Sequence, residues 1–170
     1  MEKLKEGIRT DLEREIKYKQ NQAIRNEILR NLDERVQFEL PNSVVEAQTR
    51  NNVYEIVGEN QRRGVDNDTI DQHKGEIFNH AAGTAKNKVK TSFILGRIAE
   101  KENIGATDED LTRYILATAN HYKMKPEKLV KQIQSEGSVN EIRNQIIMSK
   151  VIDWLQLNAK IEETAVSAAS

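Results

Sequence analysis

Apolar residues recur at intervals of three and four along most of this chain, and no stretch alternates apolar and polar residues as a strand does. The first helix-like stretch carries Leu4, Ile8, Leu12 and Ile16, with polar residues between them. An α-helix places residues four apart on one face, whereas a strand has a period of two. Because only two prolines and eight glycines interrupt 170 residues, the pattern predicts an all-α fold.

The apolar content is low for a chain of this length. Hydrophobic residues make up 37% of the sequence and aromatic residues 5%, against 31% charged residues. Charged side chains are almost never fully buried unless they are paired. This large number of charged side chains requires a large solvated surface. We therefore expect an elongated multi-helix body with projecting helical arms rather than a sphere.

Breaks in the apolar pattern divide the chain into six expected helices. Pro41 disfavours a helical conformation at the residue before it, and Asn42 or Ser43 can cap the helix that follows. Two further starts have the spacing of a capping box, Thr107 with Asp110 and Ser138 with Glu141. The first three helices are expected over about 2–31, 43–63 and 76–102, the next two begin near 107 and 126, and the last spans about 138–157.

The polar stretch "RRGVDNDTIDQHKG" separates the second and third helices and predicts a turn between antiparallel partners. The third helix has one apolar stripe in its first half and apolar residues on several sides in its second half. Such a helix is expected to have its first end in solvent and its second end in a core. We therefore expect a helical domain over 1–158 with a projecting hairpin arm over about 42–92, followed by a flexible tail over 159–170.

Residues that commonly perform chemistry are scarce. The chain has no cysteine, no glycine-rich phosphate loop and no nucleophile motif. His73, Glu76 and His80 have a spacing that differs from that of zinc-protease helices, and solvated side chains explain them better than a metal site does. We expect no catalytic residue, no cofactor and no metal.

The charge balance does not direct the chain to a polyanion as a whole, with 26 basic against 27 acidic residues. Lys86, Lys90, Arg97 and Lys101 share one side of the third helix, so an RNA-contacting protein or a helical adaptor is the alternative function. No aromatic residue lies among these cations to stack on bases, which makes nucleic acid an unfavoured partner. No apolar run reaches the roughly 20 residues of a membrane span and no signal peptide is evident, so we expect a cytoplasmic protein without membrane contact.

An ordered series of segments resembles the C-terminal chaperone domain of bacterial trigger factor. The series is "IRTDLEREIKYKQNQAIRNEIL", "FELPNSVVEAQ", "AKNKVKTSFILGRIAEKENI" with "ATDEDL", "YKMKPEKLV" and "IRNQIIMSKVIDWL". The resemblance implies a helical body with two projecting arms, similar also to chaperones of the SurA type, that holds unfolded or nascent polypeptides without ATP. The ribosome-docking and peptidyl-prolyl isomerase domains of full-length relatives have no counterpart here. Ribosome contact is therefore expected only through a domain missing from this chain, and a weak homodimer is left open.

Two apolar groups are the candidate client-binding residues. A two-helix arm cannot bury both of its sides, so part of its apolar surface is expected to stay open to partners. The resemblance implies the same for the turn near Tyr122, although Thr118 and Gln132 are polar where the family often carries larger apolar side chains. The candidates are Val45, Val53, Ile56 and Phe78 on the arm, and Tyr122, Leu129 and Ile133 around the turn.

Overall fold

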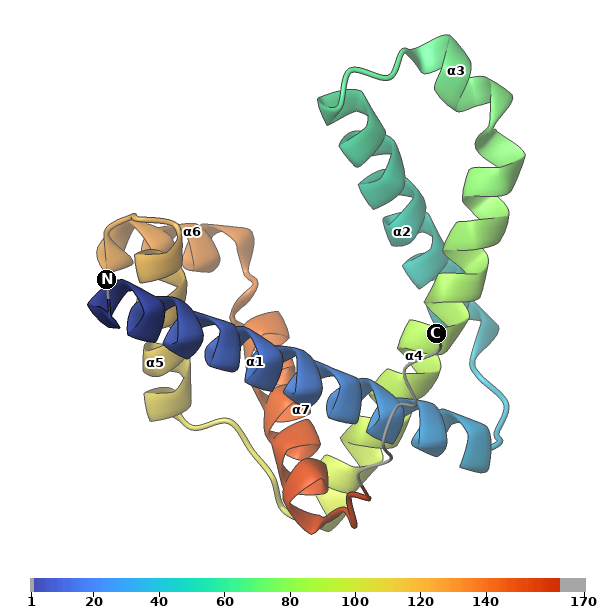
Figure 1. Cartoon of the computed structure of the whole chain (residues 1–170). Helices are drawn as coiled ribbons and strands as arrows, with labels where there is room; N and C mark the ends of the chain where they lie inside the picture. Colours follow the sequence, from blue (N-terminus) through green and yellow to red (C-terminus); the bar gives the residue numbers. More distant parts are fainter. Residues whose placement is uncertain (1, 163–170) are drawn as a thin grey trace, which may run out of the picture. The chain divides into compact units, whose positions relative to one another are not determined.

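The computed structural model of the chain describes residues 2–162, and the side chains of residues 5–162. Every regular element in this range is a helix, which confirms the all-α prediction (Figure 1). The side chain of Leu4 lies outside the described side chains. Most of the predicted flexible tail, residues 163–170, lies outside the described residues. The helices are α1 (Glu2–Arg35), α2 (Asn42–Arg62), α3 (Asn67–Gln72), α4 (Lys74–Lys101), α5 (Asp108–His121), α6 (Pro126–Glu136) and α7 (Val139–Asn158).

The described chain contains one helix more than expected. The polar stretch that predicts a turn between the second and third helices contains α3, a helix of six residues. Asp66 begins it, because the Asp66 carboxylate accepts hydrogen bonds from the backbone N–H and the hydroxyl of Thr69, both at 2.8 Å. A side-chain cap of this kind compensates for weak helix propensity at a helix start.

The chain divides into two compact units, Met1–Asn31 with Glu102–Ser170, and Leu32–Lys101. The second unit contains α2 and α4, which pack side by side in antiparallel order with α3 at their connection (Figure 1). Small residues of α4 form this contact: Ala81 and Ala85 are 0% exposed, and Val89 is buried as well. The first half of α4 is therefore packed against α2 through alanines, which allow two helix backbones to approach closely.

A buried polar network fixes the register of α2 on α4. The Asn52 side chain donates to the backbone carbonyl of Ala81, at 3.0 Å. Its own oxygen accepts from Gln48 at 2.9 Å and from the Lys88 ammonium at 3.2 Å. Thr49, the other buried polar residue of α2, donates to the carbonyl of Val45 in its own helix. Since buried polar groups are costly unless paired, only a narrow range of registers satisfies this network.

The segment before α2 is attached to α4 by one ion pair and one aromatic pair. The Lys90 ammonium lies 3.3 Å from the Asp33 carboxylate, and the Lys90 side chain is only 13% exposed. The rings of Phe38 and Phe93 lie 6.2 Å apart in a tilted arrangement. Both contacts lie within the unit Leu32–Lys101.

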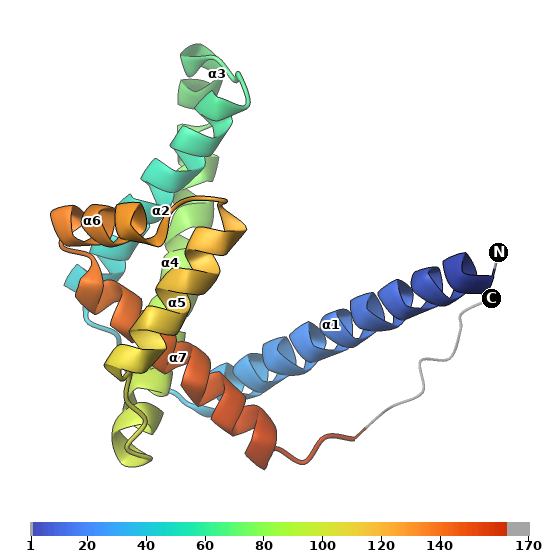
Figure 2. The ribbon, with the colours of Figure 1, turned by 90° about the vertical axis from the view of Figure 1, so that its left-hand side faces the viewer.

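In the other unit, α5 packs against α6 and α7 (Figure 2). Its core is built from three buried isoleucines, one on α6 and two on α7. They are Ile133, Ile142 and Ile146, with Ala106, Leu111, Tyr114, Ile115, Leu129 and Val139 packed against them. Val151 of α7 is also fully buried. Helix α7 thus contributes several core residues, as the apolar residues on more than one of its faces predict.

Cations of α7 hold the segment that leads into α5. Lys150 donates to the Gly105 carbonyl and to the Asp110 carboxylate, both at 2.8 Å. Arg143 donates to the Ala106 carbonyl at 3.0 Å and pairs with Asp108. The capping box predicted for Thr107 and Asp110 is present. Asp110 therefore stabilises the start of α5 and its contact with α7 at once.

Two predicted caps are wrong. Ser138 precedes α7 without a side-chain cap, so its predicted capping box with Glu141 does not form. Helix α2 begins after Pro41, again without a side-chain cap, so neither Asn42 nor Ser43 has the predicted role. Ser138 has a φ of −85° and a ψ of 8°. That is not the extended conformation that brings a cap side chain to the helix N–H groups.

The apolar stripe of α1 is exposed rather than packed. Ile8, Leu12 and Ile16 have exposed fractions of 52%, 52% and 55%. The prediction that this side of the helix packs is therefore wrong for the described residues, because no described helix of the same unit lies beside this part of α1 (Figure 2). Within its unit, α1 is attached further along, through the Arg25–Asp153 ion pair and a hydrogen bond between Asn21 and Gln156.

Replacing Asn52 by Ala is expected to lower the free energy of unfolding by about 1–3 kcal/mol, because its hydrogen bond to the Ala81 carbonyl is lost and the Gln48 and Lys88 side chains lose their acceptor. The measurement is chemical denaturation followed by circular dichroism. Asn51→Ala is the matched control, since Asn51 is the exposed neighbour on the same helix. Equal stability of the two variants would contradict a register-fixing role for Asn52.

Acid is expected to destabilise the protein partly through Asp110. The hydrogen bond from Lys150, and then those from Thr107, lower the pKa of the Asp110 carboxyl well below its usual range. A carboxyl whose pKa is lower in the folded chain stabilises it above its ordinary pKa of about 4, and this stabilisation is lost as the pH falls further. Thermal unfolding between pH 7 and pH 2 should therefore depend less on pH in Asp110→Asn than in the wild type. Glu141→Gln is the control that should keep the wild-type slope.

Candidate functional site

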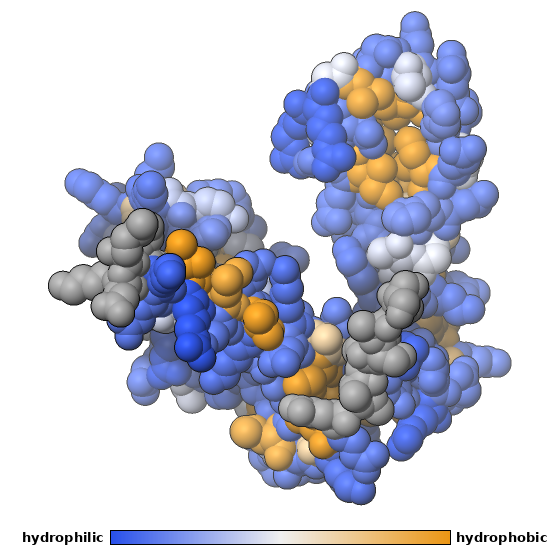
Figure 3. Space-filling model, viewed as in Figure 1, coloured by the Kyte–Doolittle hydropathy of each residue, from blue (hydrophilic) through white to orange (hydrophobic). Residues whose placement is uncertain are grey.

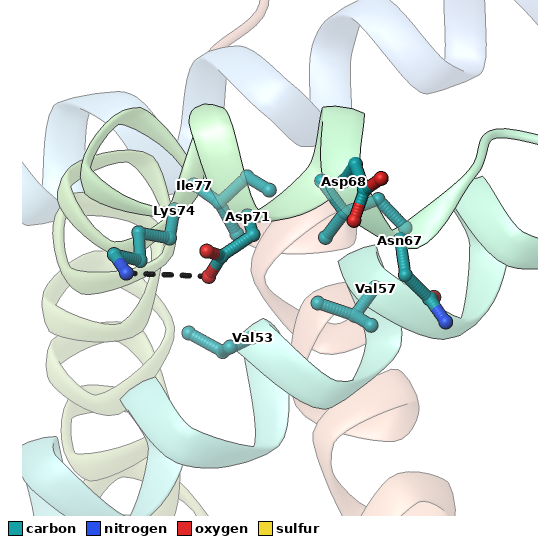
Figure 4. Close-up of a pocket in the computed structure, with 8 residues that line it drawn as sticks. Val53, Val57, Asn67, Asp68, Asp71, Lys74 and Ile77 are labelled. Atoms are coloured by element: carbon teal, nitrogen blue, oxygen red, sulfur yellow. Dashed lines mark hydrogen bonds and ion pairs between the residues drawn. The ribbon is translucent and has the colours of Figure 1, made fainter.

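The unit of α2, α3 and α4 contains an open hollow with a volume of about 480 Å³ (Figure 4). Its apolar lining comes from all three helices: Val53 and Val57 on α2, Ile70 on α3, and Ile77 on α4. These side chains are half-buried. The hollow is therefore a surface on which a further apolar group can be buried.

The rim of the hollow is polar, with two acidic residues, one basic residue and one amide. Asn67, Asp68 and Asp71 of α3 line it together with Lys74, whose ammonium lies 3.2 Å from the Asp71 carboxylate. Figure 4 shows this ion pair at the edge of the hollow, with Val53 and Val57 on the opposite side. The hydrogen bonds from the backbone and then the side chain of Thr69 lower the pKa of Asp66, so the cap of α3 is ionised at neutral pH.

Apolar side chains are concentrated at this end of the hairpin. Figure 3 shows them over the α2–α4 hairpin, and a separate line of them along α1. Phe78 of α4 is 56% exposed, and Tyr54 of α2 is also exposed. The hairpin thus presents exposed and half-buried apolar groups of several sizes within a strongly polar surface.

The structure places the four hairpin candidates differently. Val53 lines the hollow, and Phe78 is exposed on α4. Val45 and Ile56 are half-buried on α2, and neither lines the hollow. Only Val53 of the four is thus in the hollow.

The three candidates near the α5–α6 turn also separate. Tyr122 is 68% exposed and its ring lies edge-on to His121, with centroids 5.0 Å apart. Leu129 is half-buried against the isoleucine core. Ile133 is only 6% exposed and belongs to that core. Its side chain therefore stabilises the packing of α6 on α7 and is not available to a client.

Sequence reasoning missed three residues of the hollow, Val57, Ile70 and Ile77. They become neighbours because α3 lies at the connection of α2 and α4, in a stretch that the sequence predicts as a turn. The signal present in the sequence was Asp66 followed three residues later by Thr69, which is the spacing of a capped helix start. Ile70 and Ile77 lie on two different helices, α3 and α4, so the spacing of residues along one helix does not bring them together.

The basic face expected on the third helix is partly neutralised. Lys90 is paired with Asp33 and is nearly inaccessible, and Arg97 lies 2.7 Å from Glu100. Lys86 and Lys101 are exposed, and neither forms an ion pair with a residue that the structure describes. Two exposed cations at separate positions give weak attraction to a phosphate backbone.

The spacing of His73, Glu76 and His80 does not form a metal site in the described residues. His73 Nδ1 lies 2.9 Å from the Thr69 carbonyl at the end of α3. In residues 2–162, no group of three or more His, Asp or Glu side chains has the geometry to hold a metal ion. Each helix in the described part of the chain is too short or too polar to span a lipid bilayer.

Known proteins contain a domain similar to this chain. The family described as bacterial trigger factor protein C-terminus matches residues 1–156. The chain belongs to the bacterial trigger factor C-terminal family. It is 29% identical to the trigger factor of Opitutus terrae over 162 residues, which cover 95% of this chain and 37% of that protein. It is 30% identical to the trigger factor of Alkaliphilus oremlandii over 165 residues, which cover 95% of this chain and 38% of that protein.

A solved structure supports the same fold. It belongs to a study of the structures of, and interactions between, domains of trigger factor from Thermotoga maritima. The two folds agree with a TM-score of 0.62 at 18% identity, over 82% of this chain and 83% of that one. The chain spans little more than a third of the length of the curated trigger factors it matches. The resemblance stated from the sequence is therefore confirmed for family and fold.

Replacing Asp66 by Ala is expected to loosen α3, because the Thr69 N–H and hydroxyl both lose their acceptor. Hydrogen exchange measured by mass spectrometry should show faster exchange of the backbone amides in residues 67–72. Asp68→Ala, a neighbouring acidic residue that caps nothing, is the control and should leave the exchange of α3 close to wild type. Unchanged exchange in Asp66→Ala would mean that packing around the hollow, rather than the cap, holds α3.

Proposed function

We propose that this chain is an ATP-independent chaperone module that binds apolar segments of unfolded or nascent polypeptides and delays their aggregation. Membership of the trigger factor family supports a role in protein folding. The observation that carries the finer proposal is the open apolar hollow between α2, α3 and α4. We place the activity in the cytoplasm, where nascent chains are exposed.

The proposed client surface of the hairpin consists of Val53 and Val57 in the hollow, and Ile56 and Phe78 on the same two helices. Val45 is retained at the other end of α2 as a further apolar contact. Tyr122 and Leu129 form a second client surface in the other unit. Each surface is small and surrounded by charged side chains, which keep the chaperone itself in solution.

Weak individual contacts suit this task. If one surface buries about 400 Å² of apolar area, the gain is about 10 kcal/mol at roughly 25 cal/mol/Å². Association costs about 4–15 kcal/mol, so one surface alone binds weakly. Two surfaces that engage one unfolded chain raise the affinity through effective concentration, and each contact still releases quickly. Rapid release leaves the client free to fold.

The proposal requires no catalyst and no cofactor. Peptidyl-prolyl isomerase activity and ribosome docking are not assigned to these residues. The alternative of an RNA-contacting protein is weakened by the pairing of Lys90 and Arg97. A helical adaptor that binds one folded partner is the alternative function, and suppression of aggregation distinguishes a chaperone from it.

The test is light scattering during dilution of a chemically denatured, aggregation-prone protein, with and without an excess of this chain. Suppression that persists at moderate salt is expected, because apolar contacts are not screened as ion pairs are. The triple variant Val53→Ser, Val57→Ser and Phe78→Ser should bind clients about tenfold more weakly, which corresponds to about 1.4 kcal/mol. Circular dichroism confirms that the variant is folded.

The control variant is Ile8→Ser, Leu12→Ser and Ile16→Ser, which removes exposed apolar groups of comparable size from α1. It should retain most of the suppression. If the control loses as much as the hairpin variant, the hairpin surface is not the client site. If the wild-type chain suppresses nothing at stoichiometric excess, the chaperone proposal fails and the adaptor reading takes its place.

A further inference from the structure

Helix α3 is held in the hairpin unit mainly by one apolar side chain. Its six residues have the sequence NDTIDQ, and Ile70 is the only apolar residue among them. None of the six is buried, although α3 contacts both α2 and α4. Ile70 lines the hollow, where the apolar side chains of the other two helices are Val53, Val57 and Ile77 (Figure 4). The hydrophobic contact between α3 and the rest of its unit therefore depends on Ile70.

The other residues of α3 contribute little to holding it in place. Asn, Asp and Thr are weak helix formers, and an isolated helix of six residues is unstable in water. The side-chain contacts at the two ends of α3 are exposed: Gln61 donates to Asn67 at 3.1 Å, and Lys74 pairs with Asp71 at 3.2 Å. Exposed contacts of this kind add little to stability. Moving α3 away from the hollow therefore has a small energetic cost.

The long helices on either side do not need α3 for their packing. The contact between α2 and α4 involves Ala81 and Asn52, and neither residue lines the hollow. Before α3, the N–H of Val65 donates to a carbonyl of α2 at 3.0 Å. After α3, His73 is the only residue that separates it from α4. Residues 66–72 can thus move as one segment while α2 and α4 stay together.

We propose that residues 66–72 are a strap, in which Ile70 occupies part of the client surface until a client displaces it. This inference rests on the proposed function and concerns the regulation of its hairpin surface. Ile70 meets Val53 and Val57 in the hollow, which is the contact that the proposed function assigns to an apolar side chain of a client. The strap is therefore an internal competitor for the surface on which it lies.

A displaceable strap limits the exposure of the apolar surface between clients. An uncovered apolar surface promotes association between copies of a protein. With Ile70 in place, part of the surface of Val53, Val57 and Ile77 is removed from water. When a bound client loosens, Ile70 returns to the hollow and competes with it, which speeds release. The apparent affinity for a client is lowered in proportion to the fraction of molecules in which the strap is open.

The first test is the binding of a fluorescein-labelled peptide with a Leu-Ile-Phe centre and Ser-Gly flanks to the full chain, measured by fluorescence anisotropy. Ile70→Ser removes the competitor and should bind the peptide about threefold more tightly than the wild type, which corresponds to a strap closed in about two thirds of the free molecules. A wall of the client site would behave in the opposite way, because losing Ile70 would then weaken binding. Gln72→Ser is the control on the same helix, since Gln72 is exposed and does not line the hollow.

Asp66→Ala opens the strap by a second route. The Asp66 carboxylate caps α3 and does not line the hollow, so this variant loosens the strap but keeps Ile70. It should bind the peptide about twofold more tightly than the wild type, because the strap is open more often. Weaker binding by both Asp66→Ala and Ile70→Ser would overturn the inference and make α3 part of the client surface.

The gain in affinity must also come from the hollow. In a chain that carries Val53→Ser and Val57→Ser, the further change Ile70→Ser should give no gain, because the surface that it uncovers is no longer apolar. A gain that persists in this background would come from another part of the chain and would overturn the inference. Far-UV circular dichroism checks that each variant keeps its helical content.

Hydrogen exchange detects the displacement in the unsubstituted chain. Saturating peptide should speed the exchange of the backbone amides of residues 67–72 by about threefold, because the strap is then open in every molecule. The amides of residues 79–92 in α4 are the internal control and should not exchange faster. Slower exchange in residues 67–72 would mean that the peptide packs on α3, which contradicts a strap.

Failure of the proposed function gives a different result. If neither the wild type nor Ile70→Ser binds the peptide, the chaperone proposal fails and the strap fails with it. If both bind the peptide with equal affinity, the chaperone proposal stands and the strap is wrong.

Discussion

The close packing of α2 on α4 is the constraint on which the rest of the hairpin unit depends. Ala81 and Ala85 are completely buried, and the Asn52 side chain joins the two helices through the Ala81 carbonyl. A shift of register would leave the Asn52 amide buried without its partner on α4, which is costly in a low-dielectric interior. The hollow lined by Val53, Val57 and Ile77 exists only in the register that this contact selects.

The second unit is held together in a different way. A small isoleucine core joins α6 and α7, and cations of α7 fix the segment before α5 through Lys150 and Arg143. These interactions use backbone carbonyls that the irregular segment cannot satisfy itself. A chain with a lean apolar content thus supplements its core with charged hydrogen bonds, and it still leaves apolar side chains such as Tyr122 on its surface.

The proposed chaperone function rests on this incomplete burial. A folding enzyme needs an enclosed site with converging polar groups, whereas a chaperone needs shallow apolar surfaces that accept many sequences. The hairpin hollow has the second character, since it is open and four half-buried apolar side chains line it beside polar ones.

The sequence by itself determined the helical class, the family and most helix boundaries, because the apolar period, prolines and capping residues are local signals. The capping box at Thr107 and Asp110 belongs to this group. Tertiary structure alone decided which apolar stripes are buried: Ile133 became core, while Ile8, Leu12 and Ile16 remained exposed although their spacing is equally regular. It also decided that Ile70 and Ile77 join Val53 in one hollow. The physical reason is that helical periodicity identifies an apolar face, but burial depends on whether another element lies against that face.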